Sequence, residues 1–219
     1  MKYSITHNPS YAMLNFTLSP GDSIKTESGA MVYMDEALDV ETSFGSGFLS
    51  AISRKFLGGE SMFLNTYTAR EEVRLGVAPE FAGDIQHVEL NNESLVLQKG
   101  AYLCSDAGIE IKTKFGGLKS LISREGVFLL EAAGTGNLFF NSYGAIIKKP
   151  VNGEFILDTG HLVAFEPTLQ YKVQKTGGWK STLFSGEGFT MRFEGTGNVW
   201  IQTRVRKGLV DWIMGFLPR

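Results

Sequence analysis

The feature that most constrains the fold of this chain is an internal repeat with a fixed spacing. "GGLKS" at 116–120 recurs as "GGWKS" at 177–181, and "GTGN" at 134–137 recurs at 195–198, so both motifs are displaced by 61 residues. Two separate motifs that share one offset indicate a duplicated structural unit. The fold must therefore contain similar modules packed beside one another.

A looser copy of the same unit precedes these two. "GFLSAISR" at 47–54 resembles "GLKSLISR" at 117–124, and "FLNTY" at 63–67 resembles both "FFNSY" at 139–143 and "WIQTR" at 200–204. Small insertions account for the change in spacing. The chain is thus expected to hold three repeat units.

Strand patterns fill the segments between these motifs. "IEIKTKF" from Ile109 alternates apolar and polar residues, and "VWIQTRV" from Val199 is rich in β-branched and aromatic residues, as half-buried strands are. We interpret "GTGN" as a hairpin turn, because Gly and Asn tolerate positive φ. The sequence therefore predicts an all-β fold, one compact sandwich or barrel over 1–219. Its three β-rich units are expected at 1–87, 88–154 and 155–207.

Two segments follow the helical period instead. A short helical turn is expected at 47–57, and an apolar C-terminal helix at 208–217. We expect the C-terminal helix to pack on the body or on a neighbouring subunit, with adsorption to a membrane surface as the alternative. The apolar residues of this expected interaction surface are Leu209, Val210, Trp212, Ile213, Phe216 and Leu217.

The charge pattern argues against nucleic-acid binding. The formal net charge is −2, and no basic run is interleaved with stacking aromatics, which argues against DNA and RNA as partners. Basic residues at repeated loop positions could still gather into a patch that binds an anionic partner, although ordinary solvated side chains explain them as well. The residues of this candidate patch are Arg54, Lys55, Lys119, Arg124 and Lys180.

Reaction chemistry has little support in the sequence. The single cysteine, Cys104, excludes an intramolecular disulfide and a multi-cysteine metal site. The three histidines are isolated in sequence, so we expect no metal and no cofactor. His161, which follows Asp158 in "DTGH", is the best candidate base for a hydrolase. It aligns with Ser23 and Ser94 of the other units, which favours a tolerant turn position.

"SGAMVYMD" at 28–35, "SRKFLGGESMFLNTYTA" at 53–69 and the two "GTGN" copies resemble the altered-inheritance-of-mitochondria (mitochondrial biogenesis) family, over essentially the whole chain. This resemblance implies a fold like that of the tryptophan-attenuation RNA-binding protein (TRAP). It also implies a homo-oligomer, for which a trimer is one candidate. We expect a cytoplasmic protein, because the sequence has no signal peptide, presequence or membrane span.

These observations lead to three functional hypotheses. The first is a non-catalytic homo-oligomeric scaffold or interaction protein, acting at a membrane surface or on a protein partner. The second is a small-molecule or nucleic-acid binding module that uses clefts between repeat units. The third is a hydrolase centred on His161 and Asp158.

Overall fold

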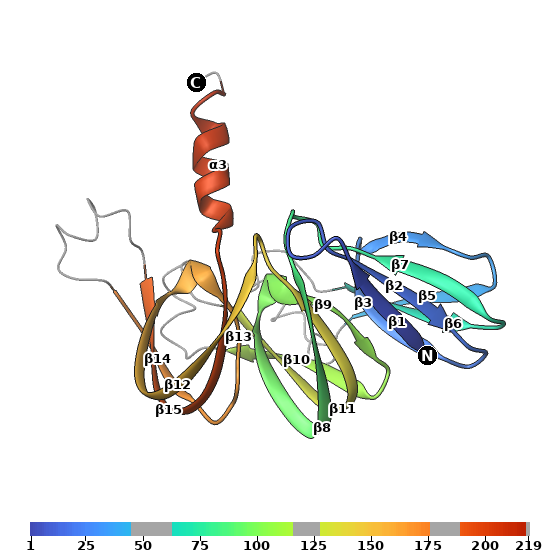
Figure 1. Ribbon diagram of the computed structural model, residues 1–219, viewed down its shortest axis with the longest axis horizontal. Helices are drawn as coiled ribbons and strands as arrows, with labels where there is room; N and C mark the ends of the chain where they lie inside the picture. The colour runs from blue at the N-terminus through green and yellow to red at the C-terminus, as the bar shows by residue number, and fades with distance from the viewer. Residues whose placement is uncertain (45–62, 116–127, 176–188, 218–219) are drawn as a thin grey trace.

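The computed structural model describes residues 1–44, 63–115, 128–175 and 189–217. Within these ranges the chain is almost entirely β-structure, with one α-helix near the C-terminus (Figure 1). The prediction of an all-β fold is confirmed. The expected helical turn at 47–57 lies outside the described residues.

The strands fall into three successive sets, which lie beside one another along the molecule (Figure 1). The first set comprises β1 (Lys2–Thr6), β2 (Met13–Leu18), β3 (Ser23–Glu27), β4 (Met31–Met34), β5 (Leu38–Phe44), β6 (Phe63–Ala69) and β7 (Val73–Val77). The second comprises β8 (Ile85–Gln98), the 3₁₀ turn η1 (Lys99–Ala101), β9 (Tyr102–Asp106), β10 (Ile109–Phe115) and β11 (Phe128–Asn141). The third comprises β12 (Ile146–Asp158), η2 (Thr159–His161), β13 (Leu162–Phe165), β14 (Gln170–Lys175) and β15 (Phe189–Gln202), and α3 (Arg206–Met214) follows. The unit boundaries expected at 87/88 and 154/155 lie inside β8 and β12.

The second and third sets have the same construction. β11 pairs along its whole length with β8, while β10 and β9 share its other edge. β15 pairs in the same way with β12 on one edge and with β14 and β13 on the other. Each "GTGN" motif lies in the middle of a long strand, so the interpretation as a hairpin turn was wrong. Gly134, Gly136 and Gly195 have positive φ, and the strand bends where its neighbour changes.

The first set is a split version of the same construction. β2 and β3, separated by a turn, stand where β8 is continuous, and β6 and β7 stand where β11 is continuous. β3, β6 and β5 belong to the eleven-stranded sheet, whereas β2, β7 and β4 form a four-stranded sheet with β1. Phe63, Phe128 and Phe189 each open the second strand of a hairpin. "FLNTY" is therefore the counterpart of "FLLEA" at 128–132 rather than of "FFNSY".

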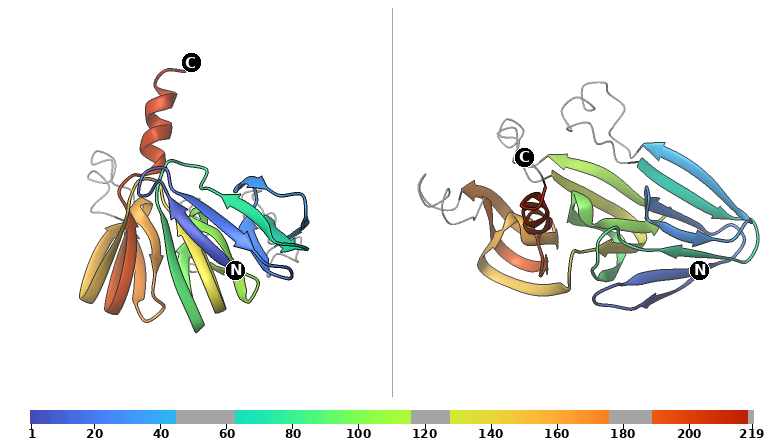
Figure 2. Two further views of the ribbon diagram at one scale, coloured as in Figure 1. Left: turned by 45° about the vertical axis from the view of Figure 1, so that its right-hand side comes forward. Right: turned by 90° about the horizontal axis from the view of Figure 1, so that it is seen from above.

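The sets are joined by strand pairing in one register. β9 pairs with β3 of the first set, with Cys104 opposite Thr26. β13 pairs with β8 of the second set, with Ala164 opposite Leu97. β4, which precedes β5 as β9 precedes β10, is one end strand of the four-stranded sheet, whose other end is β1. β12 is one end strand of the larger sheet, whose other end is β5. β4 and β12 lie at opposite ends of the molecule (Figures 1 and 2).

The side chains on the inner strand faces form three apolar clusters. One lies in the first set around Phe16 and extends to Phe139 of the second. Another joins Tyr102 of the second set to Trp200 of the third. The last lies around Phe193. All three clusters hold residues of more than one set, since the last one includes Val96 and Leu129 of the second set, and the sets therefore pack as one body.

The C-terminal helix differs from its prediction in length and composition. α3 covers Arg206–Met214 rather than 208–217, and it contains Arg206, Lys207 and Asp211, so the expectation of an apolar helix is not supported. It projects away from the strands in Figure 1 and in the left view of Figure 2. Within one chain it therefore does not pack along the body, and its packing on a neighbouring subunit stays a prediction.

Candidate functional site

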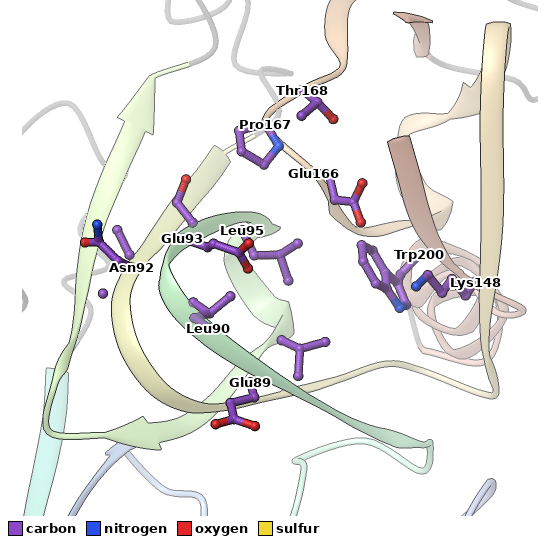
Figure 3. Close-up of a pocket in the computed structure, with 14 residues that line it drawn as sticks. Glu89, Leu90, Asn92, Glu93, Leu95, Lys148, Glu166, Pro167, Thr168 and Trp200 are labelled. Carbon is purple, nitrogen blue, oxygen red and sulfur yellow. The ribbon is translucent and has the colours of Figure 1, made fainter. Parts of the chain in front are cut away.

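A cleft of about 780 Å³ lies between the second and third sets (Figure 3). One wall is β8, and the opposite wall is formed by β12, β15 and the turn after β13. The side chains that matter most for its chemistry are Glu89, Leu90, Glu93, Lys148, Glu166 and Trp200. A cleft of this size accommodates a metabolite or a short peptide.

The edge of β8 faces the cleft. Val88, Glu89 and Leu90 all line it, although successive residues of a strand point to opposite faces. β8 pairs with β11 on one edge, and on its other edge β13 pairs only with Val96 and Leu97. Among the described strands, the cleft-side edge of β8 before Asn92 therefore has no partner.

A bulge at Asn92 turns a carboxylate toward the cleft. Asn92 has φ +57° and is skipped in the pairing of β8 with β11, and its backbone N–H donates to the Thr135 hydroxyl. Because of this extra residue, Leu90 and Leu95 belong to the same apolar cluster although they are five positions apart. Glu93 shares the face of Leu95 and points into the cleft (Figure 3).

The opposite wall presents an aromatic ring and a fixed carboxylate. The Lys148 ammonium lies 5.1 Å from the ring centroid of Trp200, within range of a cation–π contact. Glu166 accepts hydrogen bonds from the backbone N–H of Asn198 at 3.0 Å and from its side-chain amide at 2.6 Å. The cleft thus holds the carboxylates of Glu93 and Glu166 against one ammonium group, while the Glu89 carboxylate points away from the opposite wall (Figure 3).

The same carboxylate clamp occurs in every set. Asp106 Oδ2 accepts the backbone and side-chain N–H groups of Asn137, each at 2.8 Å. In the first set Asp35 accepts from the backbone and guanidinium of Arg74, at 2.8 to 3.1 Å. A Cβ at Gly136 would lie 2.8 Å from the Asp106 side chain. The "GTGN" glycines therefore leave room for a carboxylate against the strand backbone.

The proposed catalytic pair is engaged with backbone groups. Asp158 Oδ1 accepts the Gly160 N–H at 2.7 Å, and His161 Nδ1 donates to the Gln202 carbonyl at 2.6 Å. His161 ends η2 as Ala101 ends η1, so its alignment with Ser94, which lies inside β8, was wrong. Both side chains hold the turn before β13.

The remaining predicted residues divide into two groups. The candidate basic patch, Arg54, Lys55, Lys119, Arg124 and Lys180, lies outside the described residues. Cys104 is fully buried, and burial raises the pKa of its thiol well above the usual value.

In the ranges that the structure describes, no three His, Cys, Asp or Glu side chains are grouped as metal ligands, and no helix is long and apolar enough to cross a membrane.

The C-terminal segment exposes most of its apolar side chains. Val210, Trp212, Ile213, Phe216 and Leu217 are 44 to 73% exposed, and only Leu209 is half-buried. The rings of Trp212 and Phe216 pack against each other with centroids 5.1 Å apart.

The base of α3 is attached to the body through Arg206. Its guanidinium donates to the Gly100 carbonyl at 2.9 Å and lies 4.6 Å from the ring centroid of Phe81. Glu27 is close to this group. Burial, assisted by the charge of Glu80, raises the pKa of Glu27 to about 7 against the attraction of Arg206 and Lys99.

Comparison with known proteins places the chain in a family. The family model described as "Mitochondrial biogenesis AIM24" matches residues 3–204. The chain belongs to the AIM24 family. This AIM24 chain is 29% identical over 227 residues to an uncharacterized protein of Streptococcus pyogenes serotype M6, covering 100% of this chain and 92% of that protein. A crystal structure of a Streptococcus pyogenes protein matches it with a TM-score of 0.81 and 27% identity, over 99% of both chains.

The sequence contained a signal for the cleft that motif reading missed. Lys148 and Trp200 lie 61 residues after His87 and Phe139, which is the spacing of the "GTGN" copies. A comparison of the AIM24 repeats position by position would have singled out this pair. The bulge that turns Glu93 has no such signal.

Proposed function

We propose that this AIM24 protein is a non-catalytic, homo-oligomeric interaction protein whose copies join head to tail by strand pairing. One observation carries the proposal. β4 is the counterpart of β9 and β13, and β12 is the counterpart of β8. Within the chain, neighbouring sets are joined when β9 pairs with β3 and β13 pairs with β8, so the free edges of β4 and β12 could join two copies in the same way.

β4 exposes side chains that its counterparts bury. Its four residues, Met31–Met34, are 37 to 54% exposed, whereas Leu103 and Cys104 of β9 are fully buried. A strand at the edge of a sheet with apolar side chains is a ready template for pairing with another chain. A second copy of this chain could cover it.

β12 offers the complementary edge. Ile156 holds the place in β12 that Val96 holds in β8, yet Ile156 is 56% exposed and Val96 only 1%. The register of β13 on β8 would place Tyr33 and Met34 of one copy opposite Leu157 and Ile156 of the next. Such a head-to-tail contact closes into a ring or continues as a filament. The family resemblance favours a small ring, such as a trimer.

The exposed C-terminal segment supports the same proposal. Its apolar side chains stand away from the strands, so a neighbouring copy is the partner we propose for them. Burying each large side chain would contribute up to about 1.5 to 3 kcal/mol before entropy costs. A membrane surface is the competing partner, and co-sedimentation with anionic vesicles that is lost on deleting 209–219 would favour it.

The two edges can be tested separately by light scattering. The full chain should have a mass that is a multiple of 24.1 kDa, and both Met34→Lys and Ile156→Lys should give monomers. A mixture of the two variants retains one intact pair of edges and should give a dimer. Tyr11→Lys, at a 75% exposed site away from both edges, is the control. Variants that keep the mass of the full chain would contradict the proposal.

A further inference from the structure

The junction between the first and second sets is filled by the N-terminal strand. β1 pairs with the outer edge of β2, with Tyr3 opposite Phe16. The Tyr3 ring lies edge-on to Phe139, with centroids 4.9 Å apart, and its hydroxyl lies 3.0 Å from His87 Nδ1. The other His87 nitrogen, Nε2, lies 2.8 Å from the Asn137 amide oxygen. A tyrosine on an added strand thus completes this junction.

The cleft lies at the junction between the second and third sets, in the position that β1 fills at the first junction, and no described strand is added there. The residues that contact Tyr3, His87 and Phe139, have their counterparts 61 positions later in Lys148 and Trp200. Both pairs lie at corresponding places in corresponding strands, since β8 matches β12 and β11 matches β15. The clamped pairs Asp106–Asn137 and Glu166–Asn198 also match. The first part of β8 matches β2, and its outer edge borders the cleft.

We propose that this cleft is a peptide-binding site, in which an extended segment of a partner protein adds to the open edge of β8 and places a tyrosine against Trp200. The backbone of β8 would supply the affinity of strand addition, and the ring would supply side-chain specificity. The Lys148 ammonium would donate to the tyrosine hydroxyl from the position where His87 Nδ1 accepts the hydrogen of the Tyr3 hydroxyl, because His87 Nε2 donates to the Asn137 amide oxygen.

The charges of the cleft indicate a basic partner segment. Glu93 and Glu166 outnumber Lys148, and Glu93 points toward the space that the segment would occupy (Figure 3). β1 has this composition, because Lys2 precedes Tyr3. The β1 of the same chain is already paired with β2, so the partner segment must come from another polypeptide. This inference concerns a different surface from the end strands of the proposed oligomer.

A labelled heptapeptide with the sequence of residues 1–7, MKYSITH, is the probe. We expect saturable binding in fluorescence anisotropy, weakened about tenfold or more by a Tyr→Ala change in the peptide, as removal of an anchoring aromatic does. N-methylation of alternate peptide nitrogens should abolish binding, because it removes donors of the strand ladder. Equal binding of the methylated peptide, or no binding at millimolar concentration, would overturn the proposal.

Protein variants identify the site. Glu93→Lys should weaken binding about tenfold, since it reverses one charge beside a basic peptide. Lys148→Met should reduce the preference for tyrosine over phenylalanine in the peptide. Lys149→Met on the same strand should change neither the affinity for the peptide nor this preference. All three residues are exposed, so the fold should be retained. Binding that Glu93→Lys and Lys148→Met leave unchanged would place the peptide elsewhere, for example on β2 in place of β1, and would refute the assignment.

Discussion

Gly136→Ala tests the claim that the "GTGN" glycines exist to admit a carboxylate. Gly136 has φ +140°, where a side chain costs about 1 to 3 kcal/mol of backbone strain. A Cβ there would also lie 2.8 Å from Asp106 Cβ and 2.9 Å from Asp106 Oδ2. The substitution therefore adds a collision to the strain.

The collision should cost more than the strain. It would move the Asp106 carboxylate away from Asn137, whose backbone and side-chain N–H groups both donate to it. Hydrogen bonds to a charged group contribute roughly 1.5 to 3 kcal/mol each, and partial relaxation would preserve some of this. We expect Gly136→Ala to lower the free energy of unfolding by about 3 to 5 kcal/mol in total.

Gly153→Ala is the matched control. Gly153 has φ +104°, but a Cβ there would meet nothing within 4 Å, so only the strain remains. Equilibrium unfolding in urea, with comparable m-values, should give Gly136→Ala the lower free energy of unfolding by about 2 kcal/mol or more. Equal free energies for the two variants would refute the clamp as the reason for the glycine.

Two further predictions concern titratable groups whose pKa is raised by burial, the half-buried Glu27 and the buried Cys104. Burial raises the pKa of Glu27 to about 7 from an ordinary value of 4.5, so the folded state binds the extra proton between these values. Stability should therefore fall by up to about 3 kcal/mol as pH rises from 4.5 to 7, and Glu27→Gln should remove this fall in urea midpoints measured across that range. Cys104 is buried and its thiol pKa is raised, so a thiol reagent should label it at the rate of global unfolding. Labelling faster than unfolding would contradict this.

The sequence predicted the parts of the fold that depend on periodicity. Alternation in "IEIKTKF" placed Ile109 and Ile111 on one face, and both are buried in β10. The 61-residue offset correctly matched β11 with β15, because a repeat preserves the spacing within a hairpin. Both signals are local in the chain.

Features that depend on pairing partners could not be read in this way. Gly and Asn suit a hairpin turn and a strand bend equally well, and only the exchange of β10 for β9 beside β11 decides between them. Sequence similarity also matched "FLNTY", which begins β6, to "FFNSY" at the end of β11, although its structural counterpart is the start of β11. Glu93 reaches the cleft only because Asn92 is skipped in the ladder, and no residue pattern announces that skip.

The differences between the sets explain why the molecule has open edges where it does. In the first set a turn between Ala69 and Val73 interrupts the strand that is continuous in β11. β7 therefore belongs to the smaller sheet, and β4 is an end strand with one unpaired edge. Nothing in the described part of the chain adds to the first part of β8 as β1 adds to β2. Two pairings are both present at the first junction: β1 is added at the outer edge of β2, and the short strand β9 is paired with β3 of the preceding set. Their unfilled counterparts are the cleft beside β8 and the exposed edges of β4 and β12, so three surfaces of this protein follow from one repeated design.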